Sequence, residues 1–340
     1  MPYPLLTQRK TPGAVAQEGG STADFRWLIN ANAVNGDSDM PLRSPLHDVL
    51  DAVWPGRTPL DRDSDLTPAL ALARANQVQG ALARSYPLAL AAELRRVEIA
   101  TAAFDTALTE AAGRLRAHGV DPVLIKCVPG ADHVYSNFDL VVGDMVPDAL
   151  RALNGWGVRT SRHPFERTKV LVYPRAGPAA HMHREASWWD VPSVDGTLLR
   201  SRALDTGLWL VPARVDELRI WVAHALFQNL AVDLAELLAL RPLLEDTLIE
   251  QAASDCRREG WERGFRRVVT VVRQVVRVLD DGGAPPVPLR LPMRASGALS
   301  EHVWHLGATG RPGAAVRESV LRGPLLLAKA RRVRRTRATA

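Results

Sequence analysis

Apolar side chains return with a helical period in two long parts of the sequence. Between residues 67 and 118 they recur every three or four positions, the spacing of one face of an amphipathic helix, and Gly119 ends this pattern. The positions of this stripe are Leu94, Val97, Thr101, Phe104, Leu108, Ala111 and Leu115. Beyond residue 212 the same period predicts four helices, over 215–230, 232–240, 246–258 and 261–279.

Between these helical parts the period shortens and Pro and Gly become frequent. A helix is expected over 148–156, and a further short one near the beginning, over 45–53. Short apolar runs predict strands over 122–126, 138–142, 169–173 and 180–183. This order predicts an α+β fold, in which a small mixed sheet forms a module between a helical segment and a helical bundle. The expected parts are an irregular extension (1–65), a helical segment (66–118), the α+β module (119–212), the bundle (213–290) and an extension with a basic tail (291–340).

The composition is that of an ordinary globular protein. With 46% hydrophobic and 24% charged residues, a chain of 340 residues can bury a sizeable core. Its two cysteines, Cys127 and Cys256, exclude a disulfide framework and favour a reducing compartment. The first ten residues lack the apolar segment of a signal peptide, and no apolar run is long enough to span a membrane. We therefore expect a cytoplasmic protein without membrane contact, and the oligomeric state stays open.

The excess positive charge lies at the end of the sequence. The net charge is +6, and residues 329–340 hold six basic side chains and no acid. Such a tail can touch nucleic acid or an anionic surface, but a solvated terminus is the preferred interpretation. No aromatic residues alternate with these arginines, so bases would find no stacking platform. Nucleic acid is therefore not an expected partner.

One acid interrupts an apolar run, in the segment S-N-F-D-L-V-V. Because side chains of a strand alternate between faces, Asn137 and Asp139 lie on the same face. A buried carboxylate is unfavourable unless it meets a metal, a cation or hydrogen-bond donors. Asp139 is therefore the first candidate functional residue.

Five segments of the sequence together resemble the pattern of a known protein family. They are A-R-A-N-Q-V-Q-G-A-L-A-R-S-Y, H-G-V-D-P-V-L-I-K-C, S-N-F-D-L-V-V, A-H-M-H-R-E and V-D-E-L-R-I-W-V-A-H-A-L-F. Together, over about residues 66–289, they resemble the uncharacterised nucleotidyltransferase family of the polymerase-β-like superfamily. The resemblance implies transfer of a nucleotidyl group from a nucleoside triphosphate (NTP) to a small-molecule or peptide acceptor, with Mg²⁺ or Mn²⁺, in natural-product biosynthesis. Two such ions need several carboxylates, and the family supplies an Asp-x-Asp pair and an Asp two residues before a His.

The family pattern is carried over to this sequence residue by residue. Asn137 and His181 stand where the family has acids, and Cys127 stands where it has Gly. The implied metal ligands are Asn137, Asp139, His181 and His183. The implied catalytic residues are Asp139, Lys126 and His183, and the implied triphosphate contacts are Lys126, Gly130, Ser136 and Asn137.

Three hypotheses for this site stay open. In the first, the protein transfers nucleotides with one metal, and Asp132, Asp144 or Glu185 supplies missing charge. In the second, His181, His183 and Asp139 form a two-His-one-carboxylate site, which suits Zn²⁺ or Fe²⁺. In the third, the fold has lost this reaction and binds a ligand or partner, with Asp139 paired to Lys126 across adjacent strands.

Other polar residues have a structural interpretation beside the functional one. His224 is expected to be a hydrogen-bonded core residue, although the resemblance places a His there facing the module. Asp233 and Glu236 could offer carboxylates to a substrate, but their spacing is typical of a solvated helical face. Cys127 is expected to be an unreactive buried thiol. The sequence contains no Walker P-loop, G-x-G-x-x-G after a strand, paired C-x-x-C or G-x-S-x-G.

Overall fold

The computed structural model describes residues 44–59, 65–127, 133–163, 166–188, 191–229 and 231–291, and parts of 303–320. They all belong to one of the two units into which the chain divides, Leu42–Ala340. The expected irregular extension lies mostly, and the basic tail wholly, outside the described residues. No helix of the described part combines the length and the apolar character needed to cross a membrane.

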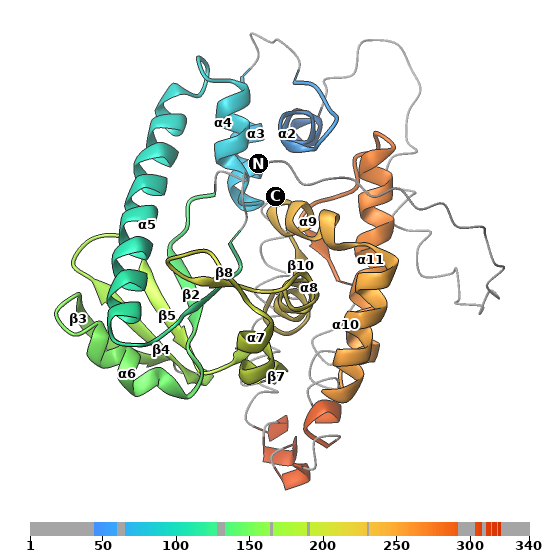
Figure 1. Ribbon diagram of the computed structural model, residues 1–340. Helices are drawn as coiled ribbons and strands as arrows, with labels where there is room; N and C mark the ends of the chain where they lie inside the picture. Colours follow the sequence, from blue (N-terminus) through green and yellow to red (C-terminus); the bar gives the residue numbers. More distant parts are fainter. Residues whose placement is uncertain are drawn as a thin grey trace, which may run out of the picture. The chain divides into compact units, whose positions relative to one another are not determined.

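Four helices come first along the described chain, and they confirm the helical pattern before residue 119 (Figure 1). They are α2 (Pro45–Val53), α3 (Thr67–Ala75), α4 (Gln79–Ser85) and α5 (Ala91–Ala117). The apolar stripe of α5 is buried at Val97, Phe104, Leu108, Ala111 and Leu115. The long helix is therefore held by packing of this stripe.

A seven-stranded mixed sheet follows, which confirms an α+β chain and extends the predicted sheet. Its strands are β1 (Val123–Ile125), β2 (Asn137–Val141), β3 (Gly157–His163), β4 (Glu166–Pro174), β5 (Ala179–His183), β8 (Leu204–Asp205) and β9 (Leu210–Val211). The spatial order is β3-β4-β5-β2-β1-β9-β8. Strand β2 runs parallel to β5 and antiparallel to β1, so it occupies the middle of the sheet.

One face of this sheet packs against α5 and against α6 (Val146–Ala152). Phe138, Leu140 and Val142 join the apolar stripe of α5 in a single buried cluster. Because β2 alternates its side chains, Asn137 and Asp139 project from the opposite face. The packing of one face therefore turns the polar residues of β2 toward the helices that follow.

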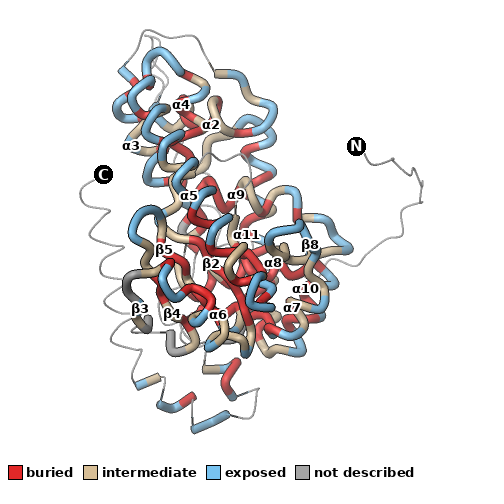
Figure 2. Tube along the Cα trace, turned by 60° about the vertical axis from the view of Figure 1, so that its left-hand side comes forward, coloured by how far each residue is buried: buried red, intermediate tan, exposed pale blue. Residues whose placement is uncertain are grey.

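The remaining elements are short pieces of the α+β module and the second helical part, which begins at α8. Figure 2 shows buried stretches concentrated where β2, α8 and α11 lie. The elements are η3 (Gly143–Met145), β6 (Ala186–Trp188), β7 (Val191–Val194), α7 (Gly196–Arg202), α8 (Arg214–Ala223), η4 (His224–Asn229), β10 (Ala231–Val232), α9 (Leu234–Leu240), η5 (Arg241–Leu243), α10 (Asp246–Arg258), α11 (Glu262–Asp280) and β11 (Leu289–Arg290). The four helices predicted after residue 212 are confirmed, with one difference. Helix α8 widens into the π-helical segment η4 at His224, and β10 separates this segment from α9.

A buried ion-pair network joins α8 to α10. Arg219 of α8 is fully buried and lies 2.7 Å from the buried carboxylate of Asp216 and 3.4 Å from that of Asp255. It also pairs with Glu259. Removing one partner of such a network leaves a buried charge with less compensation. This lowers the free energy of unfolding far more than the loss of an exposed pair does.

We expect Arg219→Met to lower the free energy of unfolding by about 3–5 kcal/mol. The control is Arg273→Met, which removes an exposed pair with Asp246 (2.7 Å) and should change stability by less than about 1 kcal/mol. Urea unfolding of both variants gives the comparison. Equal effects would contradict a structural role for the buried network.

Candidate functional site

The sheet brings four basic side chains to one carboxylate. Strand register places Asp139 opposite Ile125 of β1 and opposite His181 of β5. Lys126 follows β1 directly, and Lys169 of β4 lies opposite His183 of β5. His181 and His183 are two residues apart on one strand and so share a face.

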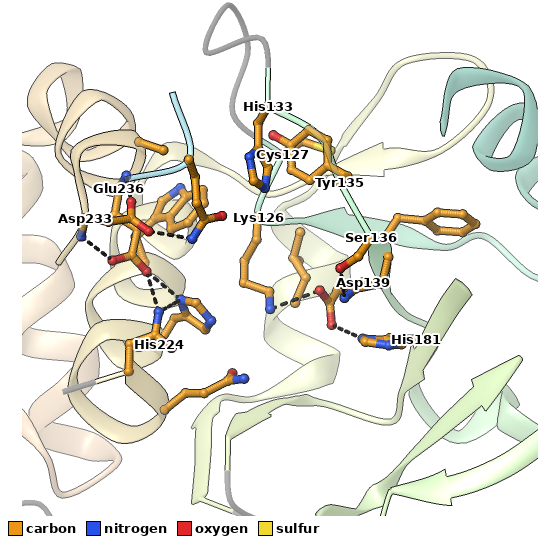
Figure 3. A pocket seen from close by; sticks show the side chains of 18 of the residues that line it. Lys126, Cys127, His133, Tyr135, Ser136, Asp139, His181, His224, Asp233 and Glu236 are labelled. Atoms are coloured by element: carbon orange, nitrogen blue, oxygen red, sulfur yellow. Dashed lines mark hydrogen bonds and ion pairs between the residues drawn. The ribbon is translucent and has the colours of Figure 1, made fainter. Parts of the chain in front are cut away.

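Asp139 is buried and bound through both carboxylate oxygens (Figure 3). Its Oδ2 lies 3.0 Å from Nζ of Lys126, which confirms the predicted pair. Its Oδ1 accepts a hydrogen bond from Nε2 of His183 at 2.6 Å. The same oxygen lies 3.4 Å from Nδ1 of His181 and 3.7 Å from Nζ of Lys169.

These contacts decide the ionisation of Asp139. Burial opposes the charged form, but Lys126, His181, His183 and Lys169 outweigh it and hold the pKa of Asp139 well below its ordinary value. The group is therefore a carboxylate. Two lysine ammonium groups face this one carboxylate. The face of the sheet that carries these residues, which forms one wall of the site, therefore has excess positive charge.

Lys126 reaches Asp139 from an unusual backbone conformation. Its φ is +61°, in the left-handed region that non-glycine residues seldom occupy. The ammonium also lies 5.7 Å from the ring centroid of Trp188, within cation–π distance. Backbone and indole together fix the direction of this lysine.

A cavity of about 250 Å³ separates this wall from the second helical part. Figure 3 shows Lys126, Asp139 and His181 on one side, and His224, Asp233 and Glu236 on the other. The implied triphosphate contacts Ser136 and Asn137 also line the cavity. Gly130 lies outside the described residues.

The interpretation of Asp233 and Glu236 as a solvated helical face is wrong. Both are buried, because α9 begins at the cavity and not at the surface. Asp233 Oδ1 accepts from the backbone N–H of Glu236 at 2.8 Å, and Glu236 Oε2 accepts from that of Asp233 at 3.1 Å. This reciprocal arrangement is a capping box, whose Asp-x-x-Glu spacing before an apolar run was the signal in the sequence.

His224 is hydrogen-bonded, as predicted, and it also lines the cavity. Its Nδ1 lies 2.8 Å from Oε1 of Glu236, and Nδ2 of Asn229 donates to the same oxygen at 3.0 Å. Gln77 donates from Nε2 to Oδ2 of Asp233 at 2.6 Å. Both His224 and Asn229 belong to η4, and such π-helical segments are rare and often occur at functional sites.

The acids of the helical wall and the thiol of Cys127 hold protons more tightly than usual. Burial raises the pKa of Glu236 to about 7. Burial and the neighbouring Glu236 raise the pKa of Asp233 well above its ordinary value. Burial and the charge of Asp139 raise the pKa of Cys127 to about 12, which keeps this half-buried thiol protonated and unreactive, as expected.

No family model matches the chain, and searches of curated proteins and of solved structures return no match.

Asp139, His181 and His183 have the geometry of a three-ligand metal site. One donor atom from each lies within 4.8 Å of the others. The set contains two imidazoles, so it suits a transition ion and not Mg²⁺. Both oxygens of Asp139, however, already bind cationic or N–H groups, and Lys169 would lie beside any ion on Oδ1.

A pair of Mg²⁺ ions fits these residues poorly, because among the described residues of this wall Asp139 alone supplies negative charge. Two of the three acids that could supply the missing charge lie elsewhere. Asp144 is exposed and pairs with Arg184 at 2.7 Å, and Asp144 and Glu185 line a different cavity. Asp132 lies outside the described residues.

We predict that Glu236→Gln changes how stability depends on pH. The folded-state pKa of about 7 exceeds the ordinary value of 4.5, so this group's contribution is complete below pH 4.5 and is lost as pH rises through 7. Relative to the variant, the parent should lose up to about 3 kcal/mol across this range.

Urea unfolding of both proteins at intervals from pH 4.5 to 8 measures this difference. Glu110→Gln, which removes an exposed glutamate of α5, controls for the substitution itself. A difference between parent and Glu236→Gln that stays constant with pH would show that Glu236 titrates as an ordinary glutamate.

Proposed function

We propose that the chain is a nucleotidyltransferase-like protein, whose cavity binds a nucleoside triphosphate and an acceptor side by side. The observation that carries the proposal is the convergence of Lys126, Lys169 and two histidines on the single carboxylate of Asp139. The excess positive charge at this wall suits phosphate oxygens. The resemblance in sequence supports the same class of ligand.

The two walls suit the two halves of a nucleotidyl transfer. In this reaction an acceptor oxygen or nitrogen bonds to the α-phosphorus as pyrophosphate leaves. Negative charge develops on the phosphate oxygens, and fixed ammonium groups of Lys126 and Lys169 would stabilise it. On the other wall, His224 beside Glu236 would take the proton of the acceptor, since a carboxyl that titrates near neutral pH can assist such a transfer.

The cavity also offers surfaces for a planar group. Phe104, His133 and Tyr135 line it, and their rings lie against one another, with centroid distances of 4.7 Å for Phe104–Tyr135 and 4.4 Å for His133–Tyr135. Aromatic faces of this kind stack on nucleobases without strong base preference. A nucleoside with its phosphates toward Lys126 would use both features.

A binding protein without turnover is a second candidate. The observation in its favour is that Asp139 is already engaged by protein groups through both oxygens. Asn137 and His181 offer no negative charge beside it. The site could therefore bind a ligand without catalysing its reaction.

We expect one of ATP, GTP, CTP and UTP to raise the melting temperature of the full chain, because a ligand that binds only the folded state stabilises it by mass action. The panel is measured with and without Mg²⁺ or Mn²⁺, on the parent and on Lys126→Met, which should lose the response. Arg114→Met on the exposed side of α5 is the control.

Pyrophosphate release in the presence of amine or alcohol acceptors then separates an enzyme from a binding protein. Stabilisation without release would favour the second candidate. If none of the four triphosphates changes the melting temperature, the proposed function is wrong.

A further inference from the structure

Lysine is rare in this chain, and its distribution is uneven. Of 43 basic residues only four are lysines, Lys10, Lys126, Lys169 and Lys329, and the rest are arginines. Within the described residues only Lys126 and Lys169 are lysines, and both contact Asp139. Surface ion pairs of the described part instead use arginine, as in Arg266–Glu250 and Arg273–Asp246.

The two lysines differ from surface lysines in burial. The side chains of Lys126 and Lys169 are 12% and 5% exposed, and both line the cavity. An ammonium group is a compact point charge with three donors, whereas a guanidinium group is a planar fork. The two ammonium groups lie beside opposite oxygens of one carboxylate and line the same cavity, so their positive charge faces any anion bound there.

We infer that this cavity binds a polyphosphate directly through Lys126 and Lys169, with no divalent ion between protein and phosphate. This inference rests on the proposed function and adds how the phosphates are held. Asp139 fixes the two ammonium groups and leaves their combined charge in excess. His181 lines the same cavity beside the two ammonium groups, with its Nδ1 3.4 Å from the carboxylate. A divalent ion at Asp139 would have to displace these groups, because it would meet two ammonium charges within 3.0 and 3.7 Å of the carboxylate oxygens.

The test is calorimetric titration of the full chain, purified without a His-tag and treated with EDTA. The probes are tripolyphosphate and the four nucleoside triphosphates, each with EDTA and then with excess Mg²⁺. We expect tripolyphosphate to bind in EDTA, and Mg²⁺ to leave the affinity unchanged or to weaken it. Lys126→Met and Lys169→Met should each weaken binding by about tenfold or more.

Lys169→Met can fail to fold, because it removes a buried partner of Asp139. The variant Lys169→Met with Asp139→Asn avoids this, since it removes one positive and one negative charge together. The net charge of the wall is then the same as in the parent, so weaker binding of tripolyphosphate by this variant would report the lost direct contact with Lys169. Arg114→Met should bind as the parent does.

The outcomes separate this inference from the proposed function. Tripolyphosphate binding in EDTA without binding of any nucleoside triphosphate supports the inference and overturns the proposed function. Nucleotide binding only with Mg²⁺ or Mn²⁺ overturns the inference and keeps the function. A stoichiometric transition metal in untreated protein, lost in the double variant His181→Ala with His183→Ala, also overturns the inference. No binding of any probe overturns both.

Discussion

The charge balance around Asp139 is the constraint on which the site depends. A carboxylate in the middle of a sheet is tolerable only with compensation, and here two ammonium groups and two imidazoles supply it. These groups come from three segments, the end of β1, strand β4 and strand β5, so β1 and β5 must be in register with β2, and β4 with β5. The apolar cluster beneath α5 fixes that register, because a shift of one residue would exchange Phe138 and Asp139 between the two faces.

The helical wall, which carries His224, Asp233 and Glu236, differs from the sheet wall because its buried acids lack cationic compensation of the kind that Asp139 has. Asp233 and Glu236 are buried acids whose nearest partners are largely neutral, and both pKa values are raised. Their capping box begins α9, and the same carboxyl group of Glu236 lies beside His224. The capping box thus stabilises the beginning of α9 and also places the carboxyl group of Glu236 at the cavity. The two walls differ in electrostatic character. The proposed ligands would complement that difference, with the phosphates at the positive wall and the acceptor, which loses a proton in the reaction, at the helical wall.

Much of the fold could be predicted because its helices carry long apolar stripes with clear ends, as α5 does before Gly119. Strand β3, G-V-R-T-S-R-H, was missed because it has no apolar run, and β8 and β9 because each is two residues long. Asn137 and Asp139 were placed on one face by alternation alone. Lys169 was missed because its place beside Asp139 follows from the pairing of β4 with β5, which the sequence does not specify. Asp233 and Glu236 were misinterpreted because the same spacing occurs in solvated helices and in capping boxes.

The central claim is that Asp139 and Lys169 compensate each other as buried charges. A double-mutant cycle with Asp139→Asn, Lys169→Met and the combined variant tests it by urea unfolding. Each single variant should lower the free energy of unfolding by about 3–5 kcal/mol, because it leaves the other charge buried with less compensation. The combined variant should lose less than the sum of the two, by at least about 1 kcal/mol. Additive losses would contradict the account, since they would mean that the two groups do not interact in the folded protein.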